Sequence, residues 1–114
     1  MSAYQRLTAP LAKYGNRKTE FNGQRYDSKA EARRAMELRA LEMAGEITGV
    51  ETQVTYRLVV NEMLVCKYVA DFRYHDVRTG LTVVEDVKGV RTPVYRLKRR
   101  LMRACHGIDV VEVE

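Results

Sequence analysis

The spacing of apolar residues along the chain predicts an irregular start followed by alternating strand and helix segments. Residues 1–16 show no clear period, and we expect them to form an irregular N-terminal arm. Asn22-Gly23 lies between two short β-prone runs, a strong hairpin signal because both turn positions need a positive φ. We therefore expect the ordered part of the chain to begin with a β-hairpin.

Residues 28–44 are rich in helix-forming side chains and predict the first helix. Ser28 and Glu31 have the spacing of a capping box, and Gly45 is placed to end the helix. The near-helical spacing of apolar residues predicts an inward face, formed by Ala30, Met36 or Leu38, Leu41 and Ala44.

Three strand-like segments follow, at residues 50–60, 63–74 and 81–88. Asn61-Glu62 can make a tight turn between the first two segments. The third segment follows a short loop and ends at a glycine. Together these segments predict a three-strand meander.

The end of the chain predicts a second helix and a last strand. Thr92 and Pro93 have the order of an N-cap and a first helical residue. Apolar residues then repeat at i, i+3, i+7 and i+10, which predicts one buried face made of Val94, Leu97, Leu101 and Ala104. A last strand within 108–113 can pair in parallel with 81–88 through a right-handed crossover. We expect an α/β fold of the α+β kind, with a mixed sheet flanked by helices.

Length and composition fit one small domain, which we place at residues 17–114 after the arm. No apolar run approaches the roughly 20 residues that cross a bilayer. The first residues lack the apolar core of a signal peptide. We therefore expect a cytoplasmic protein with no membrane partner.

The charge of the chain is +5, from 20 basic and 15 acidic residues, which suits a polyanionic partner. Residues 91–103 contain six cations and no acidic residue. Such a run can be an ordinary solvated helix face, but mixed signs are more usual there, so we favour phosphate binding. The predicted DNA-binding residues are Arg91, Tyr95, Arg96, Lys98, Arg99, Arg100 and Arg103.

Two carboxylates and a lysine can meet on one face of the predicted meander. If Asp76 pairs with Leu81, then Asp71 lies opposite Asp86, and Lys88 shares the face of Asp86 because side chains alternate along a strand. Charges at the end of an apolar strand are costly unless they are used or paired. The alternative is a salt-bridge cluster on a solvated sheet face.

Such a group of residues suits phosphodiester cleavage. Asp71 and Asp86 supply the hard oxygen ligands that Mg²⁺ or Mn²⁺ prefers, and the carbonyl of Val87 could add another. Lys88 could orient the attacking water or stabilise charge on the phosphorus centre.

The segment Ala70-Asp71, followed by Glu85-Asp86-Val87-Lys88-Gly89, resembles the PD-(D/E)XK nuclease superfamily, and the order of elements resembles its restriction-endonuclease-like αβββαβ core. The match to a family of small phage- and prophage-encoded proteins of that superfamily spans about residues 13–113. It includes the strings Lys13-Tyr14-Gly15-Asn16, Asp27-Ser28-Lys29-Ala30-Glu31-Ala32, Tyr68-Val69-Ala70-Asp71-Phe72 and Tyr95-Arg96-Leu97-Lys98.

The resemblance implies a role for each matching residue. Asp71 corresponds to the motif aspartate, although Ala70 replaces the proline, and Asp86 and Lys88 correspond to the D/E and K positions. The helix glutamate that often joins the metal site corresponds to Glu31, which a capping box would explain equally well. Gln53 matches a polar position of the first core strand. The neighbouring Glu85 should face the other side of the sheet, as a packed or salt-bridged residue.

The resemblance further implies a metal-dependent DNA endonuclease. Small phage enzymes of this superfamily include Holliday-junction resolvases, so we expect branched DNA as substrate, a homodimer, and a role in phage recombination, repair or replication in the cytoplasm of a bacterial host. The alternatives are a non-catalytic nucleic-acid-binding accessory protein and a phage protein that binds a host protein.

Overall fold

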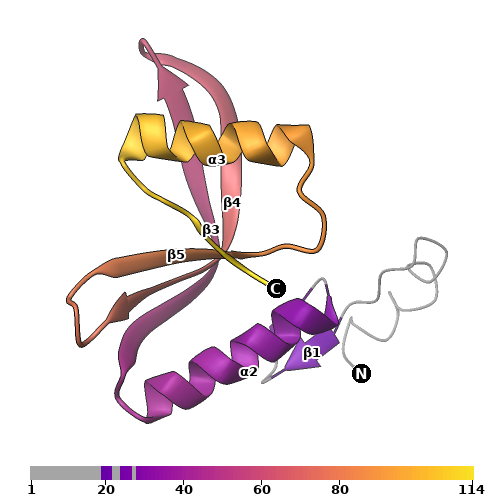
Figure 1. The fold of residues 1–114 in the computed structure, drawn as a ribbon, viewed down its shortest axis with the longest axis vertical. Coiled ribbons are helices and arrows are strands. Elements are labelled where there is room, and N and C mark those ends of the chain that lie inside the picture. The colour runs from indigo at the N-terminus through magenta and orange to yellow at the C-terminus, as the bar shows by residue number, and fades with distance from the viewer. Residues whose placement is uncertain (1–18, 22–23, 27) are drawn as a thin grey trace, which may run out of the picture.

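The computed structural model describes residues 19–21, 24–26 and 28–114 (Figure 1). The predicted arm at residues 1–16 and the turn Asn22-Gly23 lie outside the described residues. On either side of that turn, β1 (Thr19–Phe21) and β2 (Gln24–Tyr26) pair antiparallel. The pairing confirms the N-terminal hairpin.

The first helix, α2 (Lys29–Met43), has the predicted caps at both ends. Ser28 is the N-cap, and its hydroxyl accepts a hydrogen bond of 3.1 Å from the N–H of Glu31. At the other end Gly45 has a φ of +78°, and the N–H groups of Gly45 and Glu46 close the last turn on helix carbonyls.

The meander consists of β3 (Ile47–Val60), β4 (Met63–Asp76) and β5 (Thr82–Val87). Asn61 and Glu62 have φ values of 49° and 65°, which is the geometry of a two-residue hairpin turn that follows the twist of its strands. The structure confirms the three strands, with β3 beginning earlier than the sequence predicted.

The second helix, α3 (Pro93–His106), leads to β6 (Val111–Val113), which pairs in parallel with β5. Thr92 is the N-cap, and Gly107 ends the helix with a φ of 67°. The sheet order is β3-β4-β5-β6. After the hairpin the chain therefore follows the expected order αβββαβ, and the predicted α/β fold with a mixed sheet is confirmed.

Two apolar clusters hold the helices to the sheet. Figure 1 shows α3 crossing the upper part of the β3–β4 hairpin and α2 lying beside the lower part. The cluster under α2 contains Ala32, Ala35, Leu38, Ile47, Phe72 and Tyr74. The cluster under α3 contains Leu58, Tyr68, Ala70, Val84, Tyr95, Met102 and Val110.

The prediction of the buried face of α3 is wrong. Tyr95 and Met102 are buried, whereas Val94 and Leu97 are 63% and 53% exposed. The buried face lies one position along from the predicted stripe, and the larger tyrosine and methionine side chains occupy the core there. Leu101 packs at the border of the cluster.

The inward face of α2 was also predicted only in part. Leu38 is fully buried and Leu41 packs against the cluster, as expected. The other buried apolar side chains are those of Ala32 and Ala35, whereas Met36 is 48% exposed. Ala30 and Ala44 are not part of this buried cluster. Small alanines fit where the helix approaches the sheet closely.

Candidate functional site

The strand register brings Asp71 and Asp86 opposite one another, as the sequence predicted. Phe72 pairs with Glu85, so the next position along β4 and β5 places Asp71 across from Asp86. Asp86 is 1% exposed. A salt-bridge cluster on a solvated face, which was the alternative, does not describe a carboxylate at this depth.

The side chains of β4 do not keep to one face over its whole length. Tyr68 and Ala70 pack in the cluster under α3, whereas Phe72 and Tyr74 pack in the cluster under α2. Regular alternation of side chains along a strand would place all four on one face. The residues of β4 before Asp71 therefore pack against α3 and those after it pack against α2, so Asp71 lies where the two halves of the molecule meet.

On the neighbouring strand β3, Gln53 lies across from Asp71 and has an unusual backbone conformation. Its φ is +52°, a left-handed conformation that is uncommon for a residue of this type, and the pairing of Gln53 with Asp71 is missing between the pairs Thr52–Phe72 and Val54–Ala70. The Gln53 side chain donates hydrogen bonds to Glu31 Oε2 (3.1 Å) and to Asp71 Oδ1 (3.4 Å). A single amide therefore links α2 to the carboxylates of the sheet.

Glu31 is directed toward this site from the first turn of α2. Only 6% of Glu31 is exposed, and its carboxylate contributes to the negative potential at Asp71. Its backbone N–H is held by Ser28, so Glu31 belongs to the cap through its main chain and to the site through its side chain. The two explanations given for Glu31 do not exclude one another.

Asp86 is held between a tyrosine and a lysine. The Tyr68 hydroxyl donates a hydrogen bond to Asp86 Oδ2, and the Lys88 ammonium lies 3.5 Å from Asp86 Oδ1. Burial, followed by the hydrogen bond to Asp86, raises the pKa of Tyr68, so the hydroxyl remains a donor. The sequence analysis did not identify Tyr68, because strand alternation assigned it to the opposite face from Asp71.

The Lys88 side chain also rests on an aromatic ring. Its Nζ atom lies 4.3 Å from the centroid of the Tyr95 ring, a cation–π distance. Tyr95 was expected to contact DNA, but it is 6% exposed and belongs to the core under α3. The structure corrects that assignment, because the ring lies beneath the lysine and is not available at the surface.

The electrostatics at Asp71 reflect crowding of negative charge. Burial, and then hydrogen bonding to Asp86, raise the pKa of Asp71 to about 8, and repulsion from Asp86 and Glu31 adds to the increase. The N–H of Val87 donates a hydrogen bond of 2.8 Å to Asp71 Oδ2, and this bond lowers the pKa of Asp71. In a strand the N–H and C=O of one residue point to the same edge, so the Val87 carbonyl lies on the same edge of β5 as the N–H that donates to Asp71.

Glu85 lies on the other face of β5, as expected, and is fully paired there. Arg34 of α2 donates to both of its oxygens, at 2.8 Å from Nε and 2.6 Å from Nη2, and the Tyr74 hydroxyl donates to Oε2. Burial and the bond to Glu85 raise the pKa of Tyr74 to about 12. Arg34 and Tyr74 were not identified from the sequence, because nothing local links them to Glu85.

Three of the six cations expected to bind DNA form ion pairs with acidic residues near the C-terminus. Arg91 Nε lies 2.9 Å from Glu112 Oε1, and Arg99 Nη1 lies 3.3 Å from Glu112 Oε2. Arg103 Nη1 lies 2.7 Å from Asp109 Oδ1. The run of cations has no acidic residue within it, but acidic side chains of β6 and of the segment before β6 pair with half of these cations.

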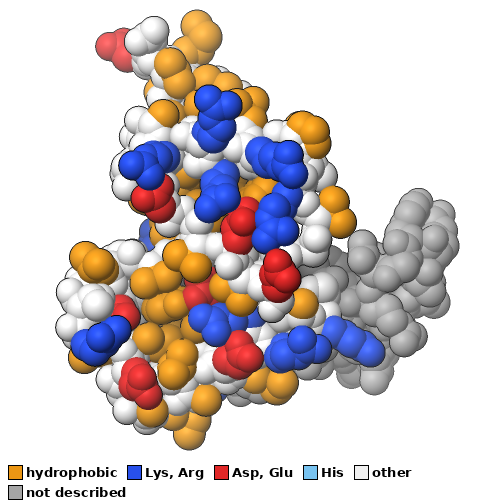
Figure 2. Space-filling view, viewed as in Figure 1, with side chains coloured by type: hydrophobic (Ala, Val, Ile, Leu, Met, Phe, Trp, Pro, Cys, Tyr) orange, Lys and Arg blue, Asp and Glu red, His pale blue; other side chains and the backbone are white. Residues whose placement is uncertain are grey.

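The remaining three, Arg96, Lys98 and Arg100, have no ion pair with any residue in the described part of the chain. Arg96 and Arg100 are exposed, and Figure 2 shows Lys and Arg side chains gathered over α3. A hollow of about 290 Å³ on this surface is lined by Arg96, Arg99, Arg100, Arg103, Asp109 and Val110.

The donor set around Asp71 fits a hard divalent cation in its chemistry. Asp71 and Asp86 are adjacent carboxylates whose mutual repulsion a cation would relieve, and carboxylate oxygens are the ligands that Mg²⁺ prefers. Over residues 28–114, no three His, Cys, Asp or Glu side chains are already arranged to hold a metal ion. Ligation by Glu31 would therefore need its side chain to move.

Residues 11–110 match the sequence model of a family described as "Protein of unknown function (DUF1064)". No curated protein and no solved structure matches the chain. In the described part of the chain, no helix is both long and apolar enough to cross a membrane.

Proposed function

We propose that the chain, which belongs to the DUF1064 family, is a metal-dependent endonuclease that hydrolyses phosphodiester bonds in DNA. The observation that carries the proposal is the carboxylate pair formed by the half-buried Asp71 and the buried Asp86, with the Lys88 ammonium 3.5 Å from Asp86. Paired carboxylates beside a lysine at a strand end are suited to binding a cation and stabilising a phosphate transition state.

Asp71, Asp86 and the carbonyl of Val87 would hold Mg²⁺ or Mn²⁺, with Glu31 as a further ligand after a small movement. When bound, the ion would neutralise charge on the phosphate and lower the pKa of a water molecule. Gln53 sets the separation of Glu31 from Asp71 by bonding to both.

The remaining residues position the reacting groups. Tyr68 fixes the rotamer of Asp86 through its hydrogen bond. The ring of Tyr95 supports Lys88, whose ammonium is then free to donate to a non-bridging phosphate oxygen or to hold the attacking water. A lysine placed in this way stabilises negative charge as it develops, which is the usual role of a fixed cation at a phosphoryl centre.

The unpaired cations of α3 support DNA as the substrate. Arg96, Lys98 and Arg100 can contact phosphates without losing an internal ion pair, whereas Arg99 and Arg103 would have to share their acidic partners. Phosphate contacts supply affinity that is independent of sequence.

Two observations favour other candidate functions. Asp71 already accepts hydrogen bonds on both of its oxygens, which would suit a non-catalytic DNA-binding protein with the same fold. Val94 and Leu97 are exposed on α3, which would suit a protein contact, either the expected homodimer or a host protein.

The test is a cleavage assay on single-stranded, duplex, flap and four-way-junction DNA, with Mg²⁺, with Mn²⁺ and with EDTA. We expect cleavage that requires the metal and is lost in Asp86→Asn. Binding without cleavage under every condition would favour the accessory protein, and dimer formation is measured on the same samples by light scattering. If neither binding nor cleavage occurs, the protein-partner alternative is favoured.

A further inference from the structure

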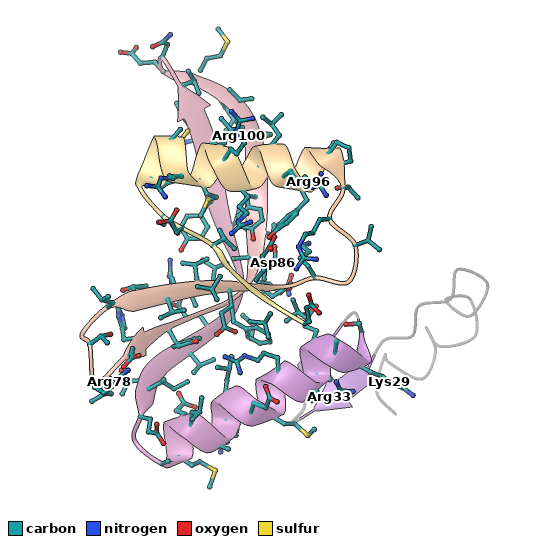
Figure 3. All side chains as sticks on the ribbon, viewed as in Figure 1. Lys29, Arg33, Arg78, Asp86, Arg96 and Arg100 are labelled. Carbon is teal, nitrogen blue, oxygen red and sulfur yellow. The ribbon has the colours of Figure 1, made fainter. Side chains whose placement is uncertain are left out.

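We propose that the substrate is double-stranded DNA that spans both helices, held by phosphate contacts from Lys29 and Arg33 on α2 and from Arg96 and Arg100 on α3. This inference rests on the proposed function and extends it, because α2 was not expected to bind DNA. Figure 3 shows these two pairs of side chains on one face of the molecule, with Asp86 between the helices that carry them.

These four cations are distinguished by being exposed and unpaired. None of them forms an ion pair within the described residues. Among the other cations of the helices and of the loop before α3, Arg34, Arg39, Arg91, Arg99 and Arg103 each have an acidic partner, and Lys98 is unpaired in the described residues but half-buried. The chain therefore neutralises part of the positive charge on its helices and leaves these two exposed pairs available to an external anion.

The spacing of each pair suits a nucleic-acid backbone. Both pairs are separated by four residues on a helix, which places their Cβ atoms about 5–6 Å apart on one face. Two such pairs on opposite sides of the carboxylates would contact the backbone on both sides of the bond to be cut. A small phosphorylated ligand could engage one pair but would not reach the other helix.

The aromatic residues favour a duplex over a single strand. Proteins that bind single strands stack bases on exposed aromatic rings. Among the residues whose side chains are described, Tyr68, Phe72, Tyr74 and Tyr95 are buried, and Tyr56 contacts His106 and Arg73. No exposed aromatic platform exists among these described side chains, whereas exposed cations are present on both helices.

The experiment measures the affinity of the metal-free protein in EDTA for a random-sequence duplex of about 30 base pairs, across a range of salt concentrations. The variants are Lys29→Gln/Arg33→Gln and Arg96→Gln/Arg100→Gln. A matched control, Lys67→Gln/Arg78→Gln, removes two exposed cations that are also unpaired in the described chain but lie on neither helix.

We expect each helix variant to lose at least about tenfold in affinity and to reduce the salt slope by about 0.9 for each lost contact, while the control stays near wild type. An unchanged affinity in the α2 variant would overturn the inference, as would tighter binding to a single strand than to the duplex. Binding that follows this pattern in EDTA, together with no cleavage when Mg²⁺ or Mn²⁺ is added, would contradict only the proposed function.

Discussion

Glu85 and Asp86 are consecutive residues of β5, both 1% exposed, and their carboxylates lie on opposite faces of the sheet. Glu85 is neutralised by the two-pronged contact from Arg34, whereas Asp86 receives a tyrosine hydroxyl and a lysine at 3.5 Å. Two neighbouring buried acids therefore serve different purposes. Glu85 binds α2 to the sheet through Arg34, and Asp86 remains available to a cation.

Removing Arg34 should destabilise the fold without acting directly on the site. Arg34→Met leaves Glu85 buried without its partner, and we expect a loss of about 3–5 kcal/mol in the free energy of unfolding, measured in urea. Arg34→Met/Glu85→Leu should recover much of that loss, because both charges are then removed. If the single variant is as stable as wild type, the ion pair does not hold α2 in place.

Asp71→Asn and Asp86→Asn should each lower the cleavage rate by at least about 100-fold while duplex binding is retained. Each change removes a proposed metal ligand and also removes negative charge that repels phosphate. Calorimetric titration with Mn²⁺ should show weaker binding in both variants. Unchanged metal affinity in folded variants would mean that these carboxylates are structural.

Lys88→Met should keep metal affinity near that of wild type and reduce the cleavage rate by about 10²–10³-fold, because a fixed cation acts on charge that develops in the transition state. Single-turnover rates with saturating enzyme separate this effect from DNA binding. A variant that loses metal binding to the same extent as Asp86→Asn would contradict the role given to the lysine.

The ring of Tyr95 should matter for cleavage through Lys88. Tyr95→Phe keeps the aromatic face at 4.3 Å, so we expect a rate within about twofold of wild type. Tyr95→Leu removes the cation–π contact and should slow cleavage by about 2- to 30-fold, with thermal unfolding as the control for folding. Equal cleavage rates in the two variants would contradict a role for the Tyr95 ring and would mean that Asp86 alone positions Lys88.

The stability of the metal-free protein should fall as the pH rises. The pKa of Asp71 is raised to about 8 in the folded chain, so between about pH 4 and 8 the folded state holds a proton that the unfolded chain releases. The contribution of Asp71 to stability is thus fully present below its unfolded pKa and is lost as the pH approaches 8.

Thermal unfolding in EDTA between pH 5 and 8.5 measures this loss. A loss of about 1 kcal/mol corresponds to roughly 4–8 °C for a domain of this size. Asp71→Asn should flatten the profile, and Mg²⁺ should stabilise the wild type more strongly at higher pH. A wild-type profile as flat as that of the variant would contradict the raised pKa.

Local signals predicted the order of elements correctly. Ser28 and Thr92 begin the helices, Gly45 and Gly107 end them, and these caps depend on neighbouring residues only. The opposition of Asp71 and Asp86 was also predictable, because a short loop fixes the register of a hairpin.

Long-range partners could not be predicted in the same way. The contact of Arg34 with Glu85 spans 51 residues, and that of Tyr68 with Asp86 spans 18, so neither leaves a pattern in the sequence. The two halves of β4 pack against different helices, and Gln53, with its positive φ, lies opposite the point where this changes, whereas strand alternation assumes a regular strand.

At Gln53 the backbone conformation lowers the stability of the fold, whereas the side chain serves the proposed active site. A glutamine held at a φ of +52° costs on the order of 1–3 kcal/mol, which glycine would recover. Glycine would also remove the amide that joins Glu31 to Asp71. Laboratory evolution for heat resistance alone should therefore discard Gln53 early, whereas selection for DNA cleavage should retain it and accept the lower melting temperature.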